Sequence, residues 1–298
     1  MQIALHLGAH CTDEGRLLRC LIKNTDKLVE QGILVADPNR YRPMIREALQ
    51  VLKDAPATPE TEQTLIDAMV EEEEVERIVL SHDAFLGVAR RAVDRNQFYG
   101  GTGYRMPRIR SLFASCELEL FIAIANPATF IPDVFQKSAE EDFTQFLGDT
   151  DPGRLRWSNL LARLKEVVPD TPITVWCNED TPLIWHRVLR QVSGHDEFTV
   201  LDGSDDFVAQ LMTKRGFARM RSYLEGHPPQ NDRQRQRVLE AFLEKFARPD
   251  ALEQEIDLPG WTAQDVDQLT VQYEADIDVI RNMPNVRLIE PWLGSRPV

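Results

Sequence analysis

The chain has 298 residues, of which 43% are hydrophobic and 28% are charged, so it can bury a core without help from metals or disulfides. Its formal net charge of −14, from 48 acidic and 34 basic residues, argues against nucleic acids and anionic lipid surfaces as general partners. It has no run of about 18 apolar residues and its four cysteines form no CxxC pair, so we expect a cytoplasmic protein without a membrane span or disulfide framework.

The first half of the chain alternates between segments typical of buried strands and segments typical of helices. The strand segments are short apolar runs rich in β-branched or aromatic residues, whereas the helical segments repeat apolar residues every three or four positions. In chain order they are a strand at Ile3–Leu7, a helix at Glu14–Gln31, a helix at Thr61–Glu74, and strands at Arg77–Leu80 and Leu118–Ile124.

The second half continues this alternation and then becomes helical. In chain order it predicts helices at Pro127–Phe146 and Pro152–Val168, a strand at Ile173–Trp176, a helix at Thr181–Val192 and a weaker strand at Phe198–Leu201. From Asp205 onward the pattern is helical only, most clearly at Asp232–Ala247 and Ala263–Met283. Because strands that alternate with helices form parallel sheets covered on both faces, we expect an α/β domain over residues 1–204. Residues 205–298 are expected to form a helical extension packed on that domain.

The loop between the first strand and the first helix is the most informative segment. It is bounded by Gly8 and Gly15, and the backbone N–H groups of such a loop, together with the N-terminus of the helix, favour binding of an anion. The segment Ile3–Leu21, IALHLGAHCTDEGRLLRCL, resembles the donor-binding loop of the bacterial sulfotransferase family, in which H-[IL]-G-x-x-K-[TS]-G follows a hydrophobic strand. The matching positions are His6, Leu7, Gly8, Ala9, His10 and Thr12.

The resemblance implies a three-layer fold of the P-loop type and a nucleotide donor, 3′-phosphoadenosine 5′-phosphosulfate. It implies that the donor contacts Gly8, Ala9, His10, Cys11, Thr12, Gly15, Arg16 and Asn126. The corresponding reaction transfers a sulfuryl group from the nucleotide to a hydroxyl group of a small-molecule or saccharide acceptor.

The loop also departs from the family pattern. Cys11 stands at the position of the loop lysine, and Asp13 and Glu14 stand where small or hydroxyl residues contact phosphate oxygens. Two like charges in contact cost on the order of 4 kcal/mol at an effective dielectric of ~20, and Arg16 offsets at most one of the two carboxylates. The lysine charge that favours the departing sulfate is absent from this loop.

A second family signature, R-[ND]-P followed by a serine, binds the 3′-phosphate of the donor. At the corresponding place Asn126 and Pro127 remain, but Ala125 replaces the arginine, and Pro132 or Asp133 stands at the serine position. These departures leave a second function open, that of a catalytically inactive binding or interaction protein with the same fold. The sequence carries no indication of the oligomeric state.

Two histidines are candidates for the general base that takes a proton from the acceptor hydroxyl, since histidine titrates near neutral pH. His10 lies inside the loop. His82 follows a predicted strand at its carboxyl end, where open α/β sheets bind ligands. The alternative is that Ser81 or Asp83 caps the next helix and that His82 is an ordinary exposed side chain.

The segment Asn96–Arg110, NQFYGGTGYRMPRIR, is the most basic region of the chain and contains no acidic residue. We expect a flexible loop in which Tyr104, Arg105, Arg108 and Arg110 bind an anionic or saccharide substrate, because guanidinium groups pair with carboxylate or sulfate. The alternative is a surface loop held by the surplus of acidic residues. No metal site is expected, because the histidines after residue 180 share no ligand spacing.

Overall fold

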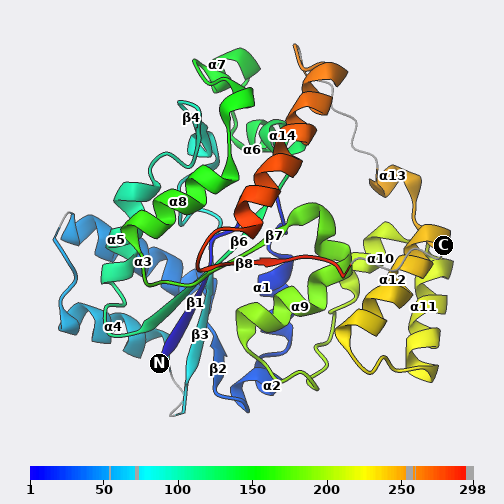
Figure 1. Cartoon of the computed structure of the whole chain (residues 1–298). Helices are drawn as coiled ribbons and strands as arrows, with labels where there is room; N and C mark the ends of the chain where they lie inside the picture. Colours follow the sequence, from blue (N-terminus) through cyan, green and yellow to red (C-terminus); the bar gives the residue numbers. More distant parts are fainter. Residues whose placement is uncertain (54, 71–73, 253–257, 259, 293–298) are drawn as a thin grey trace.

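The computed structural model describes residues 1–53, 55–70, 74–252, 258 and 260–292. Within these residues a six-stranded sheet runs in the order β2–β3–β1–β6–β7–β8, and every neighbouring pair of strands is parallel (Figure 1). The strands are β1 Gln2–His6, β2 Ile33–Val35, β3 Arg77–Ser81, β6 Glu117–Ile124, β7 Ile173–Cys177 and β8 Val286–Ile289. A small antiparallel pair consists of β4 Val93–Asp94 and β5 Gln97–Phe98.

Alternating side chains of the central strands divide the core into two layers. In β1, Ile3 and Leu5 pack into the larger core and Ala4 packs into the smaller one, because successive strand residues point to opposite faces. The larger core lies under α3 Pro38–Leu52, α4 Pro59–Met69, α5 Thr102–Ser111, α6 Pro127–Lys137, α7 Phe143–Leu147, α8 Trp157–Val167 and α14 Ala263–Arg281. The smaller core lies under α1 Arg16–Lys23, α2 Thr25–Val29 and α9 Thr181–Ser193.

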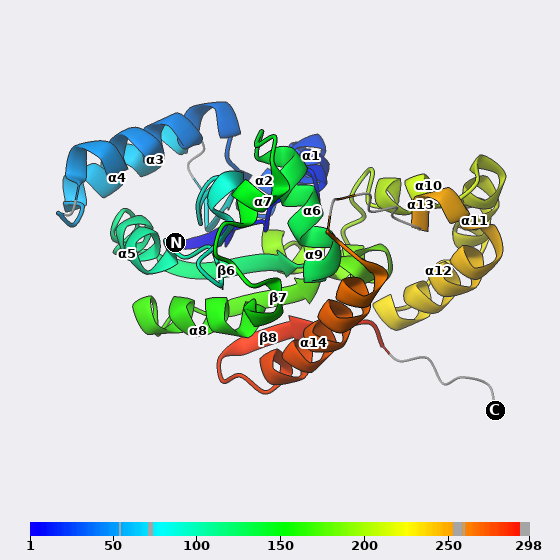
Figure 2. The same cartoon turned by 90° about the horizontal axis from the view of Figure 1, so that it is seen from above.

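The remaining helices form a group to one side of the sheet (Figure 2). They are α10 Asp206–Leu211, α11 Lys214–Gly226, α12 Asp232–Phe246 and α13 Pro249–Leu252. Their buried apolar residues, including Met220 and Leu239, form a third cluster that is separate from the two cores of the sheet. Met212 and Ala247 pair as an isolated antiparallel bridge, so the chain enters and leaves the α11–α12 hairpin at one place.

The structure confirms the α/β class, with a parallel sheet between helices on both faces. It also corrects several predicted elements. Phe198–Leu201 is not a strand, since the side chains of Phe198 and Val200 are 84% and 74% exposed. The region after residue 205 is not wholly helical, because Val286–Ile289 pairs with β7 as the sixth strand. The predicted flexible loop over residues 96–110 contains β5 and most of the helix α5.

Other boundaries shift for local reasons. The predicted helix Glu14–Gln31 is interrupted at Asn24, whose side-chain amide donates to the carbonyl groups of Cys20 and Asp202. The predicted helix Pro127–Phe146 divides into α6 and α7. None of the helices in the described residues is long and apolar enough to cross a lipid bilayer.

Candidate functional site

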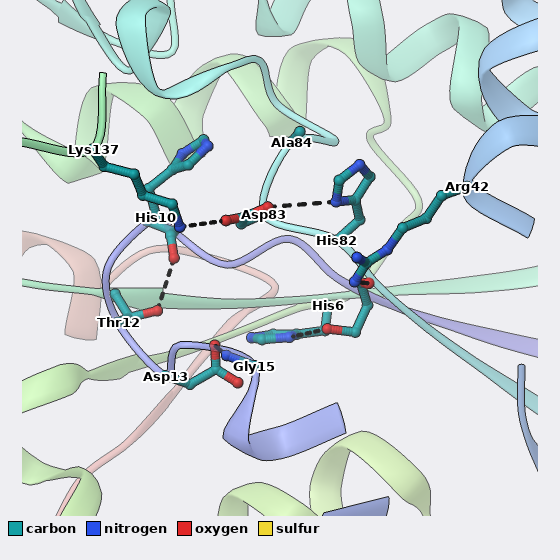
Figure 3. A network of polar contacts seen from close by, with 12 residues as sticks. His6, His10, Thr12, Asp13, Gly15, Arg42, His82, Asp83, Ala84 and Lys137 are labelled. Carbon is teal, nitrogen blue, oxygen red and sulfur yellow. Dashed lines mark hydrogen bonds and ion pairs between the residues drawn. The ribbon is translucent and has the colours of Figure 1, made fainter. Parts of the chain in front are cut away.

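The loop between β1 and α1 lies at the carboxyl edge of the sheet, between β3 and β6 (Figure 3). Its first half continues the pairing with β6, because Ala9 N–H donates to the carbonyl of Ala123 at 3.0 Å and Ala123 N–H donates to the carbonyl of Gly8. Gly8 has a φ of 95°. A Cβ atom there would lie 3.2 Å from Cα of Asp83. A glycine is therefore required where the loop crosses the end of β3.

The carboxylate of Asp13 occupies the N-terminus of α1. One oxygen accepts the N–H of Gly15 at 3.1 Å, and the other accepts the N–H of Leu17 at 3.0 Å. The side chain is buried, with 9% of the residue exposed. These are the donors that a bound phosphate uses at a helix N-terminus, and here they already have an anionic partner.

Several backbone N–H groups in the middle of the loop are not used in hydrogen bonds. The N–H groups of the residues from Cys11 to Glu14 have no acceptor among the described residues. The hydroxyl of Thr12 donates to the carbonyl of Ala9 at 2.8 Å, which holds the loop closed on itself. Under the loop, His6 Nδ1 lies 2.8 Å from Ser81 Oγ, and its buried Nε2 has no hydrogen-bond partner in the described structure.

A cation approaches this loop from α6. Lys137 Nζ lies 2.8 Å from a carboxylate oxygen of Asp83, and Figure 3 shows this pair beside His10. The neighbouring His82 ring and the Lys137 ammonium hold the pKa of Asp83 well below its usual range. Burial raises the pKa of the Cys11 thiol to about 11, so the position of the family's loop lysine carries a neutral thiol.

His10 is buried and held by Tyr99. The Tyr99 hydroxyl accepts the backbone N–H of His10 at 3.0 Å and lies 2.8 Å from Nδ1, so it donates its own proton to that nitrogen. Burial lowers the pKa of His10 to about 4, so the ring is neutral at pH 7. In this arrangement Nδ1 is the accepting nitrogen and Nε2 carries the hydrogen of the neutral ring, so the ring can take a proton only if Nδ1 leaves the Tyr99 hydroxyl. This engagement and the low pKa make His10 a weak base.

Two predicted donor contacts have other roles. Asn126 caps α6, because its side-chain oxygen accepts the N–H of Ala128, and its amide donates to Thr270 on α14. Arg16 pairs with Glu14 at 2.9 Å and also donates to Gln210 on α10. Both side chains are therefore already engaged within the protein.

The predicted substrate-binding residues are only partly brought together. Tyr104, Arg105 and Arg108 line a cavity of about 600 Å³, whereas Arg110 lies outside it and donates to the carbonyl groups of Phe113 and Ala114. We call this space the arginine cavity. Its lining is Arg42, Pro43, Ile45, Arg46, Leu49, Gln50, Lys53, His82, Ala84, Phe85, Val88, Tyr104, Arg105, Arg108 and Ile109.

α3 provides one wall of this cavity, and its residues were not predicted as site residues from the sequence. Arg42 and Arg46 are four residues apart on α3, which places them on one face of the helix, and Lys53 follows directly after the last residue of that helix. This spacing was the available signal. His82 also lies in the lining, and its Nδ1 is 3.4 Å from an Asp83 carboxylate oxygen.

Comparison with known proteins adds nothing to this geometry: no protein-family model, no curated protein and no solved structure matches the chain. In the part of the chain that the structure describes, no group of three or more histidine, cysteine, aspartate or glutamate side chains could hold a metal ion.

Proposed function

We propose that the chain is a ligand-binding protein on a sulfotransferase-like scaffold of the P-loop type, in which the β1–α1 loop does not take a nucleotide phosphosulfate. The scaffold is supported by the buried first strand, the glycine-bounded loop and the helix that follows it at the centre of a parallel sheet. The observation that carries the proposal is the Asp13 carboxylate, which accepts hydrogen bonds from Gly15 and Leu17 at the N-terminus of α1.

Entry of a phosphosulfate would oppose this arrangement in two ways. It would have to displace Asp13 from two backbone N–H groups, and such a cap contributes about 1 kcal/mol to stability. It would also come close to a buried carboxylate, and a like-charge contact costs on the order of 4 kcal/mol at an effective dielectric of ~20. A donor loop needs the opposite sign of charge at this place.

The charged contacts that would compensate are missing or engaged. Cys11 is neutral, Ala125 provides no cation for a 3′-phosphate, and Arg16 is paired with Glu14. For the same reason we expect that Cys11→Lys alone does not create tight donor binding, because Asp13 stays on the helix N-terminus. Micromolar affinity of that single variant for the donor would contradict the proposal.

Sulfuryl transfer is the second candidate function, and one observation favours it. Lys137 brings an ammonium group from α6 to the side of the loop where the N–H groups of Cys11 to Glu14 have no acceptor in the described residues. In that function Lys137 would replace the missing loop lysine, after leaving Asp83. His10 or His82 would then take the proton of the acceptor hydroxyl.

A thermal-shift titration separates the two functions. The ligands are 3′-phosphoadenosine 5′-phosphosulfate and its desulfated product, each at millimolar concentration. Binding at a thousand times Kd stabilises a protein by about 4 kcal/mol, so micromolar binding is readily seen. Because a nucleotide anion could also enter the arginine cavity, the titration includes Arg46→Glu. A rise in melting temperature that persists in Arg46→Glu and disappears in Lys137→Ala would establish donor binding at the loop and overturn the proposed function.

A further inference from the structure

We infer that the arginine cavity is a binding site for a small organic molecule that carries at least two acidic groups on an apolar body. This site lies beside the β1–α1 loop, and the inference does not depend on what that loop binds. Two walls form it. One is α3 with Arg42 and Arg46, together with Lys53 just after its end, and the other is α5 with Arg105 and Arg108.

The charge of the cavity is the first argument. None of its five cationic side chains forms an ion pair with any described residue, and the lining contains no aspartate or glutamate. This is unusual in a chain with 48 acidic residues and a net charge of −14. Five cations around one cavity, without a carboxylate in its lining, create a local positive potential that attracts an anionic ligand.

The hydrogen bonds of the arginines are the second argument. Arg42 donates to the carbonyl of Ser81 at 2.7 Å, Arg105 donates to Phe85 at 3.3 Å, and Arg108 donates to Leu49. These backbone contacts fix the guanidinium groups but do not neutralise them. A guanidinium has five N–H donors, and these backbone contacts use only one or two of them in each arginine, so others remain for a carboxylate, sulfate or phosphate.

The electrostatics agree with this geometry. Burial lowers the pKa of Arg105, and the nearby positive charge of Arg108 lowers it further. Arg105 nevertheless stays protonated at neutral pH, because an arginine titrates far above it. Two like charges held in a partly desolvated wall repel each other, and an anion between them relieves that repulsion.

The apolar surface of the cavity indicates the body of the ligand. Ile45, Leu49, Phe85 and Ile109 line it between the two rows of cations, and the guanidinium of Arg108 lies over the ring of Tyr104 at 4.7 Å. A volume of about 600 Å³ is within the range of about 300–1,000 Å³ that is usual for small-molecule sites. An apolar or aromatic body would rest on this surface while its acidic groups meet the arginines.

The cavity also has a defined inner end. Arg42 and His82 lie there, at the carboxyl end of β3, and Figure 3 shows both on the opposite side of Asp83 from Lys137. One acidic group of the ligand would meet Arg42 and Arg105 at this end. The second would meet Arg46 or Lys53, which are exposed and bind no described residue.

The test is isothermal titration calorimetry with three probes: naphthalene-2,6-dicarboxylate, which carries two acidic groups on an apolar ring, 2-naphthoate, which carries one, and neutral 2-naphthol. We expect the dicarboxylate to bind more tightly than either of the other two. Arg46→Ala should weaken its binding about tenfold and Arg46→Glu more strongly, because one charge-assisted contact is lost and then reversed. Arg46 is exposed and forms no hydrogen bond or ion pair with a described residue, so neither change should alter the melting temperature without ligand.

Arg95→Ala is the matched control, since it removes the same charge from a side chain that is 89% exposed and lies outside the cavity. It should leave the affinity for naphthalene-2,6-dicarboxylate unchanged. The inference is overturned if the dicarboxylate does not bind at millimolar concentration, if 2-naphthoate or 2-naphthol binds equally well, or if Arg46→Glu binds the dicarboxylate as well as Arg95→Ala does. Asp13→Ala should not affect this titration, so its result is independent of the loop and of the function proposed for it.

Discussion

At the scale of single residues, the negative charge of Asp13 decides whether the β1–α1 loop binds an external anion or a side chain of its own. The turn from Gly8 to Gly15 and the start of α1 provide N–H donors at the centre of the sheet edge, which is an arrangement suited to oxyanions. In this chain the oxyanion is the side chain of Asp13, supplied from within the loop. In the sequence, Asp13 stands where its charge would repel a bound phosphosulfate. In the structure the same carboxylate is stabilised by the backbone N–H groups of the loop and of α1.

The first prediction concerns this carboxylate. Asp13→Ala should lower the free energy of unfolding by about 1 kcal/mol, because the N–H groups of Gly15 and Leu17 lose their acceptor. Asp13→Asn should cost less, since its amide oxygen can still accept one of the two bonds. Urea denaturation followed by circular dichroism measures both. An Asp13→Ala protein as stable as the parent would show that the cap contributes nothing.

The second prediction concerns pH. The pKa of His10 is about 4 in the folded state because of burial, against about 6.5 in an unfolded chain. Between these values the unfolded state binds a proton that the folded state does not, so stability rises with pH in this window. Lowering the pH from about 6.5 toward 4 should therefore cost on the order of 3 kcal/mol through this residue alone.

His10→Asn keeps an acceptor for the Tyr99 hydroxyl and removes the titrating ring. We expect its unfolding free energy, measured in urea at pH 7.5 and at pH 5, to differ less between the two values than that of the parent. His227→Gln, at an exposed position, should retain the dependence of the parent. Equal pH dependence in His10→Asn and the parent would rule out the role of His10.

At the scale of elements, packing between segments far apart in sequence decides the details. The carboxylate of Asp276 on α14 accepts the N–H of Trp157 at 2.6 Å, the N–H of Ser158 at 3.2 Å and the Ser158 hydroxyl. α8 has no side-chain cap of its own at Arg156. One helix therefore provides the N-terminal cap of another, and this contact fixes α14 against the larger core.

The third prediction follows from this contact. Asp276→Ala should lower the free energy of unfolding by about 3 kcal/mol, because it leaves buried N–H groups without an acceptor. Asp278→Ala is the control on the same helix. The Asp278 side chain is 71% exposed and pairs with Arg281, so its loss should cost under about 1 kcal/mol. Equal losses in the two variants, measured by urea denaturation, would refute the proposed cap.

The elements that could be predicted from the sequence are those whose residue pattern is clear within one short segment. The buried strands β1, β3, β6 and β7 were identified because each is a compact apolar run. β2 was missed because it has only three residues, and β8 was missed because it follows a long helical region. α3 was not predicted, and α5 was predicted as a flexible loop because Gly100, Gly101 and Gly103 precede or begin it. Each of the two helices contains an internal proline, Pro43 and Pro107, which helix patterns disfavour.

The candidate site was less predictable for a related reason. The basic segment that contains Arg105 and Arg108 was visible in the sequence, but its partner wall with Arg46 lies on a helix that only tertiary packing brings alongside. The bonds of Asp13 depend on a backbone turn that composition does not specify. The donor and substrate roles of these residues, and the roles of His10 and His82 as bases, stay predictions.

At the scale of the whole molecule, the α11–α12 hairpin stands apart, because it covers neither face of the sheet (Figure 2). The α11–α12 hairpin has its own apolar cluster, and its base is closed by the bridge between Met212 and Ala247. It meets the rest of the protein through polar contacts, such as Arg190 with Asp232 and Gln236 with Trp292. It also has apolar contacts, because Val208 on α10 belongs to its cluster and Leu183 on α9 packs against it. By contrast, α14 and β8 belong to the main core and to the sheet itself.

The fourth prediction is that the hairpin can be removed. Replacing residues 213–246 with Asn-Gly, a sequence suited to a two-residue turn, should leave a protein that unfolds cooperatively with a loss of about 2 kcal/mol. Circular dichroism during heating measures the transition. Removing residues 263–292 instead should abolish it, since β7 loses its neighbour and the core loses α14. A hairpin deletion without a cooperative transition would show that the two parts fold as one.

The order of the strands has a consequence for how the protein is made. β1 lies in the middle of the sheet and pairs with β3 and β6, yet it emerges from the ribosome before either partner. At roughly 5–20 residues per second, the segment that begins at Arg77 follows Gln2 by about 4–15 seconds. During that delay an apolar strand has no partner. The order of synthesis therefore leaves this apolar segment exposed to aggregation until the strands on either side of it have been made.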